Sequence, residues 1–231
     1  LAPQNVLWRV SRKELKIEGS NLWYLVGLVT SDGCLSRDGR HVDITSKEYE
    51  FLRKLKDSLG LINKIGVKNK GKINEAYYLQ ISNRNLYEFL LSVGLTPRKS
   101  LIQDKVDVPN EFFHDFLRGL IDGDGSIRGW IHSTNKREQW SLSIYSPSWP
   151  FIEWLQKDIE RLLRVKGPIH RDIRKKPRVD LFVLKYGKIA AKEILNKCYY
   201  KDSLSLDRKA NLAKQCSLSN IGWQHSKTVL S

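Results

Sequence analysis

The sequence contains two copies of one nine-residue pattern, and this repeat constrains the fold more than any other feature. Residues 25–33 match residues 117–125, so the two copies are offset by 92 residues. Three further blocks match in the same order: residues 46–55 with 146–155, residues 78–82 with 181–185, and residues 98–100 with 208–210. Ordered matches of this kind indicate a duplicated structural unit.

The order of the blocks predicts two similar halves. We expect an N-terminal extension over residues 1–14, a first repeat over 15–103, a linker over 104–110, a second repeat over 111–216 and a tail over 217–231. The offset grows from 92 to 100 residues across the stretch 128–141. We expect a longer hairpin there, because a hairpin can lengthen without disturbing a core.

Each half shows the same succession of patterns. Residues 22–29 and 112–121 are apolar on nearly every side, as in a helix buried between two units, and Gly33 and Gly125 end these helices. Strands are predicted next over 34–37 with 41–45, and over 126–132 with 140–145. Helices over 47–59 and 150–163, strands over 65–67 with 77–82 and 169–173 with 179–184, and helices over 85–93 and 188–196 complete the repeats. The unit is α-β-β-α-β-β-α, which is an α+β fold with antiparallel sheets.

Charge indicates the kind of partner. The chain has 231 residues, with 40 Lys and Arg against 25 Asp and Glu, for a net charge of +15. This excess favours a polyanionic partner, nucleic acid first of all. A membrane is not expected, because the basic residues form no single amphipathic helix and no stretch reaches roughly 18 apolar residues. The three cysteines form no C-x-x-C pair and fit reduced thiols inside a cell.

The repeated pattern also brings two candidate metal-binding residues together. Gly27 and Gly119 each cost a helix about 1 kcal/mol relative to Ala, and they allow the two helices to pack closely. Asp32 and Asp124 would then meet at adjacent helix C-termini, where the helix dipoles and mutual repulsion are both unfavourable. A divalent cation would offset this cost. The alternatives are solvated acids before a C-capping glycine, or a calcium loop, which the residue types at its required positions exclude.

Both nonapeptides resemble the signature of the LAGLIDADG homing endonucleases in their single-chain, two-motif form. The resemblance extends over about 200 of the 231 residues. It implies that the motif helices form the interface between the halves, and that two saddle-shaped sheets lie in the DNA major groove. It further implies that Asp32 and Asp124 bind Mg²⁺, with the backbone carbonyls of Ser31 and Gly123 as additional ligands. Mn²⁺ is expected to substitute, and Ca²⁺ to bind without cleavage.

The resemblance implies further catalytic residues. A basic residue near the active site of each half maps onto Lys99 and Lys209, where it would stabilise charge on the phosphate or polarise the attacking water. Many family members have a water-positioning Gln at the end of the second strand. This sequence has Ser46 and Ser146 at those positions, so the resemblance does not indicate which residue positions the attacking water.

Outward-facing strand residues and basic loops are candidates for DNA contact, because the major groove admits a two-stranded ribbon. In the first half these candidates are Arg37, Arg40, His41, Asp43, Lys68, Lys70, Lys72, Tyr78 and Gln80. In the second half they are Arg128, Trp130, His132, Lys136, Arg137, Gln139, Ser141, His170, Arg171, Arg174, Lys175, Lys176 and Arg178. Most single lysines in such a set contact phosphates rather than bases.

The implied function is that of a monomeric, Mg²⁺-dependent, sequence-specific DNA endonuclease. Each half would hydrolyse one phosphodiester across the minor groove of a long double-stranded site and so initiate intron homing. The alternatives on the same fold are an intron maturase, with intron RNA as a partner, and a DNA-binding regulator that does not cleave. Both acids favour the nuclease. The expected location is intracellular, in an archaeal cytoplasm or in an organelle (mitochondrion or chloroplast).

Overall fold

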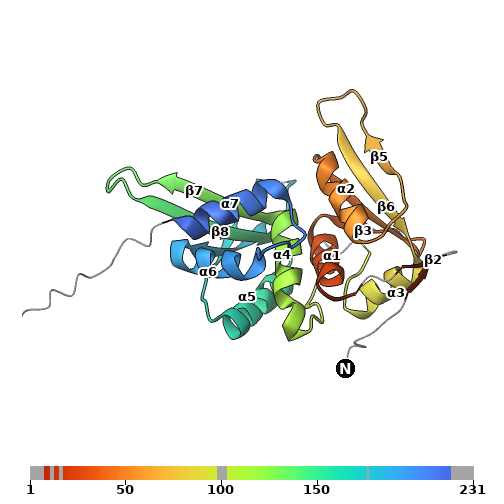
Figure 1. The fold of residues 1–231 in the computed structure, drawn as a ribbon. Helices are drawn as coiled ribbons and strands as arrows, with labels where there is room; N and C mark the ends of the chain where they lie inside the picture. The colour runs from red at the N-terminus through yellow and green to blue at the C-terminus, as the bar shows by residue number, and fades with distance from the viewer. Residues whose placement is uncertain (1–7, 11–12, 16–17, 98–102, 176, 220–231) are drawn as a thin grey trace, which may run out of the picture.

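The computed structural model describes residues 8–10, 13–15, 18–97, 103–175 and 177–219. They form two halves that lie side by side (Figure 1). The first half contains β1 (Trp8–Val10), β2 (Lys13–Leu15), α1 (Gly19–Ser31), β3 (Gly33–Leu35), β4 (His41–Ser46), α2 (Tyr49–Ser58), β5 (Ile65–Lys68), β6 (Ala76–Ser82) and α3 (Arg84–Ser92). The second contains the 3₁₀ helix η1 (Asn110–Phe112), α4 (Phe113–Asp124), β7 (Gly125–Ile131), β8 (Glu138–Ser146), α5 (Trp149–Leu163), β9 (Ile169–Asp172), β10 (Leu181–Gly187), α6 (Lys188–Cys198) and α7 (Asp207–Leu218).

The two halves have the same sheet topology. One four-stranded sheet has the order β3-β4-β6-β5, and the other has the equivalent order β7-β8-β10-β9. All neighbouring strands in both sheets are antiparallel. Helices α2 and α3 pack on the first sheet, and α5 and α6 on the second. The duplicated α+β fold predicted from the sequence is confirmed.

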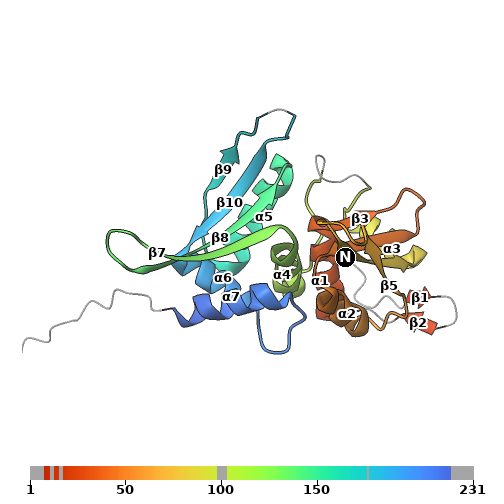
Figure 2. The same ribbon diagram turned by 90° about the horizontal axis from the view of Figure 1, so that it is seen from above.

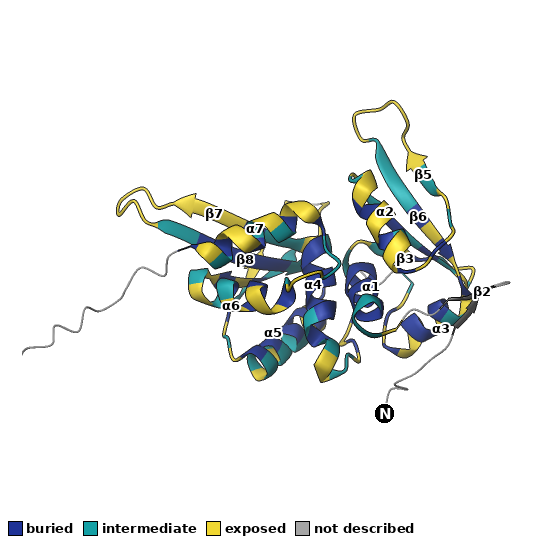
Figure 3. Ribbon diagram, viewed as in Figure 1, coloured by how far each residue is buried: buried dark blue, intermediate teal, exposed yellow. Residues whose placement is uncertain are grey.

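The centre of the molecule is the contact between α1 and α4. Nine consecutive residues of α1, from Leu22 to Thr30, are buried, and the two helices form the dark central pair between the sheets in Figure 3. A helix buried on all sides needs apolar residues all around, which is why α1 contains no charged residue. One core cluster therefore runs from the first sheet through both helices to the second.

Differences from the sequence-based expectations are local. Strand and helix ends differ by a few residues, so Arg37 and His132 lie in turns rather than in strands. The hairpin of β7 and β8 is longer than that of β3 and β4, as the growing offset predicted. Helix α7 and the short hairpin of β1 and β2 were not predicted. None of the described helices is long and apolar enough to cross a bilayer.

One detail of the repeat alignment was wrong. The sequence comparison paired Tyr78 with Leu181, whereas in the structure Tyr77 and Phe182 are equivalent, because they pair with Ser46 and Ser146. The true offset is two residues larger. A slip of two residues keeps every side chain on its face of the sheet, which explains why the alternating pattern did not reveal it.

Candidate functional site

The two motif helices touch through their backbones at the glycines. A Cβ atom added to Gly27 would lie 2.0 Å from the carbonyl oxygen of Phe116, and one added to Gly119 would lie 2.1 Å from the carbonyl oxygen of Tyr24. No side chain of any size fits at either position. The helices therefore approach as closely as their main chains allow, and their C-terminal ends are held together.

Asp32 and Asp124 lie at these adjoining ends. Asp124 is the last residue of α4, and Asp32 follows α1 directly, with its backbone N–H donating to the carbonyl of Leu28 at 3.0 Å. A Cβ atom on Gly123 would lie 3.4 Å from the carboxyl carbon of Asp32 and 1.9 Å from the hydroxyl oxygen of Ser31. The carboxyl group of Asp32 thus lies against the last turn of the opposite helix.

Lys209 supplies a positive charge at the same place. This residue is buried in the first turn of α7, and its Nζ donates to the carbonyl oxygens of Ile121, Asp122 and Gly123 at 2.5, 2.7 and 3.0 Å. Burial lowers the pKa of Lys209 to about 8, against the opposing influence of nearby acids that include Asp32 and Asp124. The ammonium group therefore caps the negative end of α4.

The donor set fits a weakly held Mg²⁺ ion rather than a preformed cage. Within the described residues, no group of three or more His, Cys, Asp or Glu side chains could hold a metal. Mg²⁺ commonly binds one or two carboxylates and completes its shell with water and substrate phosphates, and Asp32 with Asp124 meets that need. The carbonyl of Gly123 already accepts a hydrogen bond from Lys209, so the carboxylates are the stronger candidates.

Sequence reasoning missed a buried polar network beside these acids. Asp122 accepts hydrogen bonds from the hydroxyls of Tyr24 and Tyr199, at 2.8 and 2.7 Å, and from the backbone N–H of Leu206 at 2.8 Å. Burial raises the pKa of Asp122 despite these bonds. The hydrogen bond to Leu206 holds the backbone just before α7, and this positions Lys209 at the end of α4.

Arg118 is the second element of that network. It is fully buried, forms an ion pair with Asp115 at 2.8 Å, and donates to the carbonyl oxygens of Leu204 and Cys198. Its guanidinium group also lies over the rings of Tyr24 and Tyr200. The equivalent position in the first repeat is Val26, and among the described residues of that repeat no Lys or Arg is buried.

Ser46 and Ser146 have structural partners. The hydroxyl oxygen of each accepts a hydrogen bond from the backbone N–H two residues later, on Glu48 and Ser148, at 3.1 Å in both halves. Each serine thus stabilises the start of the helix that follows. A cavity of about 610 Å³ lies beside Ser46 and is also lined by Asp32, Glu48 and Arg208.

The outer faces of the sheets carry part of the candidate DNA contacts. Strand alternation places Val42, Ile44 and Leu79 against the core, so the intervening residues face outward. The candidates on these outer faces are Asp43, Lys68, Tyr78 and Gln80 in the first sheet, and Arg128, Trp130, Gln139, Ser141 and His170 in the second. Ser141 is buried there, whereas Trp130 is 46% exposed.

The remaining candidates lie in turns or have other partners. Arg37 and Arg40, Lys70 and Lys72, His132, Lys136 and Arg137, and Arg174, Lys175 and Arg178 lie in connections between strands. His41 contacts the carboxylate of Asp38, and Arg171 forms a 2.9 Å ion pair with Asp180. Lys99 and Lys176 lie outside the described residues. Lys185, on the outer face of β10, is exposed and was not among the predicted contacts.

Comparison with protein families agrees with the repeat seen here. Residues 20–94, which span most of the first repeat, match the LAGLIDADG-like domain. No protein of curated function matches the chain.

Comparison with solved structures extends over both repeats. Full-length DUF199/WhiA from Thermatoga maritima is 17% identical, with a TM-score of 0.51 over 86% of this chain; the match spans 59% of that protein. Mesophilic variants of the homing endonuclease I-DmoI are 18% identical, with a TM-score of 0.50 over 78% of this chain and 96% of theirs. The homing endonuclease I-WcaI, bound to its DNA recognition sequence, is 11% identical, with a TM-score of 0.55 over 87% of each chain. At these identities the likeness establishes the fold.

Proposed function

We propose that this chain, a protein of the LAGLIDADG family, is a site-specific endonuclease that cuts both strands of a long double-stranded DNA site. The observation that carries the proposal is the meeting of Asp32 and Asp124 at two helix ends that the glycine contact holds together. Two carboxylates opposed in this way are a liability for folding. Their presence is explained if the site binds a cation together with a phosphate group.

The residues of the chain would divide the work. Asp32 and Asp124 would hold a divalent cation, which when bound supplies an activated water and neutralises charge on the phosphate. Lys209 caps α4 and balances the two carboxylates while DNA is absent. The two outer sheet faces would bind and orient the duplex, with the surrounding basic loops on its phosphates. The chain acts as a monomer in this proposal, since it contains both halves.

Some features of the site favour a second candidate, DNA binding without cleavage. The three N–H groups of Lys209 are directed at α4 carbonyls, and the Ser46 and Ser146 hydroxyls support helix starts. A site arranged in this way has few groups left to position water. Retention of both acids still favours cleavage, because a binding protein gains nothing from them. An intron maturase, with intron RNA as its partner, is a separate alternative on the same fold.

The test is a cleavage assay on the intron-free copy of the gene that contains this reading frame. With Mg²⁺ we expect a discrete double-strand cut, and with EDTA none. Asp32→Asn and Asp124→Asn should each abolish the double-strand cut and leave DNA binding largely intact. Asp57→Asn, which removes an exposed acid on α2, is the control and should cut normally.

The outcomes separate the two candidates. Undiminished cutting of both strands by either Asn variant would show that the metal assignment is wrong. Specific binding by the wild-type protein without any Mg²⁺-dependent cut would favour the non-cleaving alternative.

A further inference from the structure

Equivalent pairs of neighbouring strand residues at the centre of the two outer sheet faces carry different charges. In the first sheet, Asp43 of β4 pairs with Gln80 of β6. In the second, Ser143 of β8 pairs with Lys185 of β10. The positions correspond because Ile44 and Ile144, the next residues along, pair with the glycines that begin β3 and β7. The pair in the first half thus contains a carboxylate on β4, and the pair in the second half contains an ammonium group on β10.

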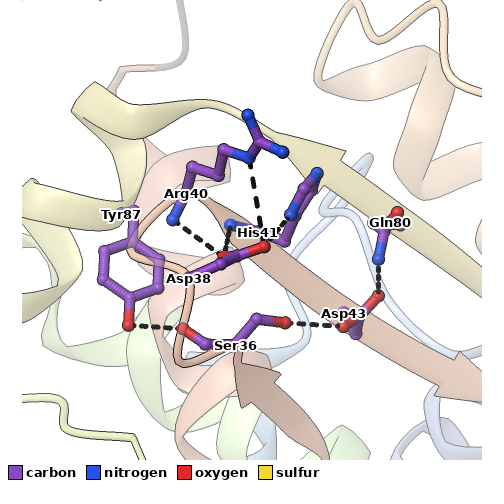
Figure 4. Close-up of polar contacts among 7 residues, drawn as sticks. All are labelled: Ser36, Asp38, Arg40, His41, Asp43, Gln80 and Tyr87. Carbon is purple, nitrogen blue, oxygen red and sulfur yellow. Dashed lines mark hydrogen bonds and ion pairs between the residues drawn. The ribbon is translucent and has the colours of Figure 1, made fainter.

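The carboxylate of Asp43 is held in place by two neutral donors. Ser36 Oγ donates to one oxygen at 3.2 Å, and Gln80 Nε2 donates to the other at 3.0 Å. Figure 4 shows Asp43 lying between these two side chains. A carboxylate accepts about four hydrogen bonds, so each oxygen retains room for a further donor.

The backbone of each donor residue is itself held by a hydrogen bond from another side chain. The carbonyl of Ser36 accepts a 2.7 Å hydrogen bond from the hydroxyl of Tyr87, and the carbonyl of Gln80 accepts a 2.8 Å bond from Asn63 Nδ2. Asp38 holds the adjoining turn through the backbone N–H groups of Arg40 and His41. The carboxylate is therefore oriented before any ligand arrives.

Such a carboxylate suits only some base edges. In the major groove cytosine presents the N4 amino donor, guanine presents the acceptors N7 and O6, thymine presents the acceptor O4, and adenine presents N6 beside the acceptor N7. An anionic acceptor is therefore matched by cytosine, is partly opposed by adenine and is repelled by guanine and thymine. A lysine has the opposite preference and favours guanine.

We propose that Asp43 and Lys185 are specificity-determining residues, which select cytosine and guanine respectively, one in each half-site. The inference rests on the proposed binding of DNA by the outer sheet faces, and it does not require cleavage.

The experiment selects duplexes from a fully randomised pool with the whole chain, in EDTA so that no DNA is cut. The wild-type protein should enrich cytosine at one position by at least about 5-fold over other bases, since a matched contact is worth that much or more. Asp43→Asn should lose this preference or move it toward adenine and leave every other position unchanged. Lys185→Met should instead relax a guanine preference in the other half-site.

Two further variants keep the test decisive. Gln80→Met removes a donor that orients Asp43, and it should weaken the same cytosine preference even if Asp43→Asn folds poorly. Glu88→Gln removes a negative charge from α3, where Glu88 pairs with Arg84, and it should change no base preference. If Asp43→Asn and Gln80→Met both leave the selected consensus sequence unaltered, the inference about base preference is wrong, while the proposed DNA binding is not contradicted. Failure of the wild-type protein to enrich any duplex would overturn the proposed DNA function as well.

Discussion

The sequence pointed to Lys209 but did not reveal its hydrogen-bond partners. The repeat pattern singled it out, and the structure places it beside both motif acids. Its hydrogen bonds, however, go to three backbone carbonyls at the end of α4. A buried lysine whose hydrogen bonds go to a helix end holds that end in place, so in the proposed reaction Lys209 would act through the position and charge balance of its neighbours. We therefore regard Lys209 as a positioning residue.

Removal of the Lys209 ammonium group should destabilise the protein. Lys209→Met leaves buried α4 carbonyls without their donor, and one such unsatisfied group costs about 1–3 kcal/mol. We expect the free energy of unfolding in urea to fall by about that amount. Lys214→Met, an exposed change on the same helix, should stay within about 0.5 kcal/mol of wild type. Equal stability of the two variants would contradict the capping role.

Other residues of the site could not have been predicted. Asp32 and Asp124 follow from the repeat itself, because the same acid recurs at the same place. Arg118 and Asp122 have Val26 and Thr30 as their counterparts, so no repeat marks them. Their importance comes from partners about 80 residues away in the chain, such as Cys198 and Leu206. Long-range burial of this kind has no local signature.

Among the elements, α7 was missed for a physical reason. Its buried residues are Lys209, Ala213 and Cys216, which are polar or small, so the segment shows no apolar stripe. The helices and strands that were predicted either have apolar residues at the expected period or, in the motif helices, are apolar on nearly every side. The buried face of α7 packs against α6 and β7, and its first turn meets the end of α4. A helix whose position depends on a capping lysine cannot be recognised from the period of its apolar residues.

The contact of α1 with α4 should tolerate no added methyl group. Gly27→Ala would place its Cβ 2.0 Å from the Phe116 carbonyl oxygen and force the helices apart. We expect a loss of at least about 2 kcal/mol in the free energy of unfolding, since overpacking of a tight core costs this much. Gly187→Ala, where an added Cβ meets nothing within 4 Å, is the matched control. A stable Gly27→Ala protein would show that the helices are less close than described.

At the scale of the whole molecule, two sheets sit on either side of one central helix pair, as the turned view in Figure 2 shows. Two exposed ion pairs also connect the halves: Arg208 with Glu48 at 2.8 Å, and Lys54 with Asp207 at 2.6 Å. Pairs of this kind contribute only about 0–1 kcal/mol each. The apolar core and the buried network therefore hold the halves together.

The position of the proposed DNA-binding face can be tested through one thiol. Cys34 is exposed and pairs with Asp43 on the outer face of the first sheet, whereas Cys198 and Cys216 are buried. Burial raises the pKa of these two thiols to about 12 and about 11, so iodoacetamide should modify Cys34 alone in the native protein. The selected duplex should slow that modification, as measured by mass spectrometry. An unchanged rate at saturating DNA would place the duplex elsewhere.

The hydrogen bond between Tyr24 and Asp122 has a consequence for protein engineering. It joins a hydroxyl of the first repeat to a buried carboxylate of the second, at 2.8 Å. Repeats of this fold invite the construction of hybrids, in which one half is replaced by that of a relative. A donor half with phenylalanine in place of Tyr24 would match every apolar contact and still leave that carboxylate short of a partner. Graftable halves must therefore be chosen by this one hydroxyl as well as by the small residues along the joined helices.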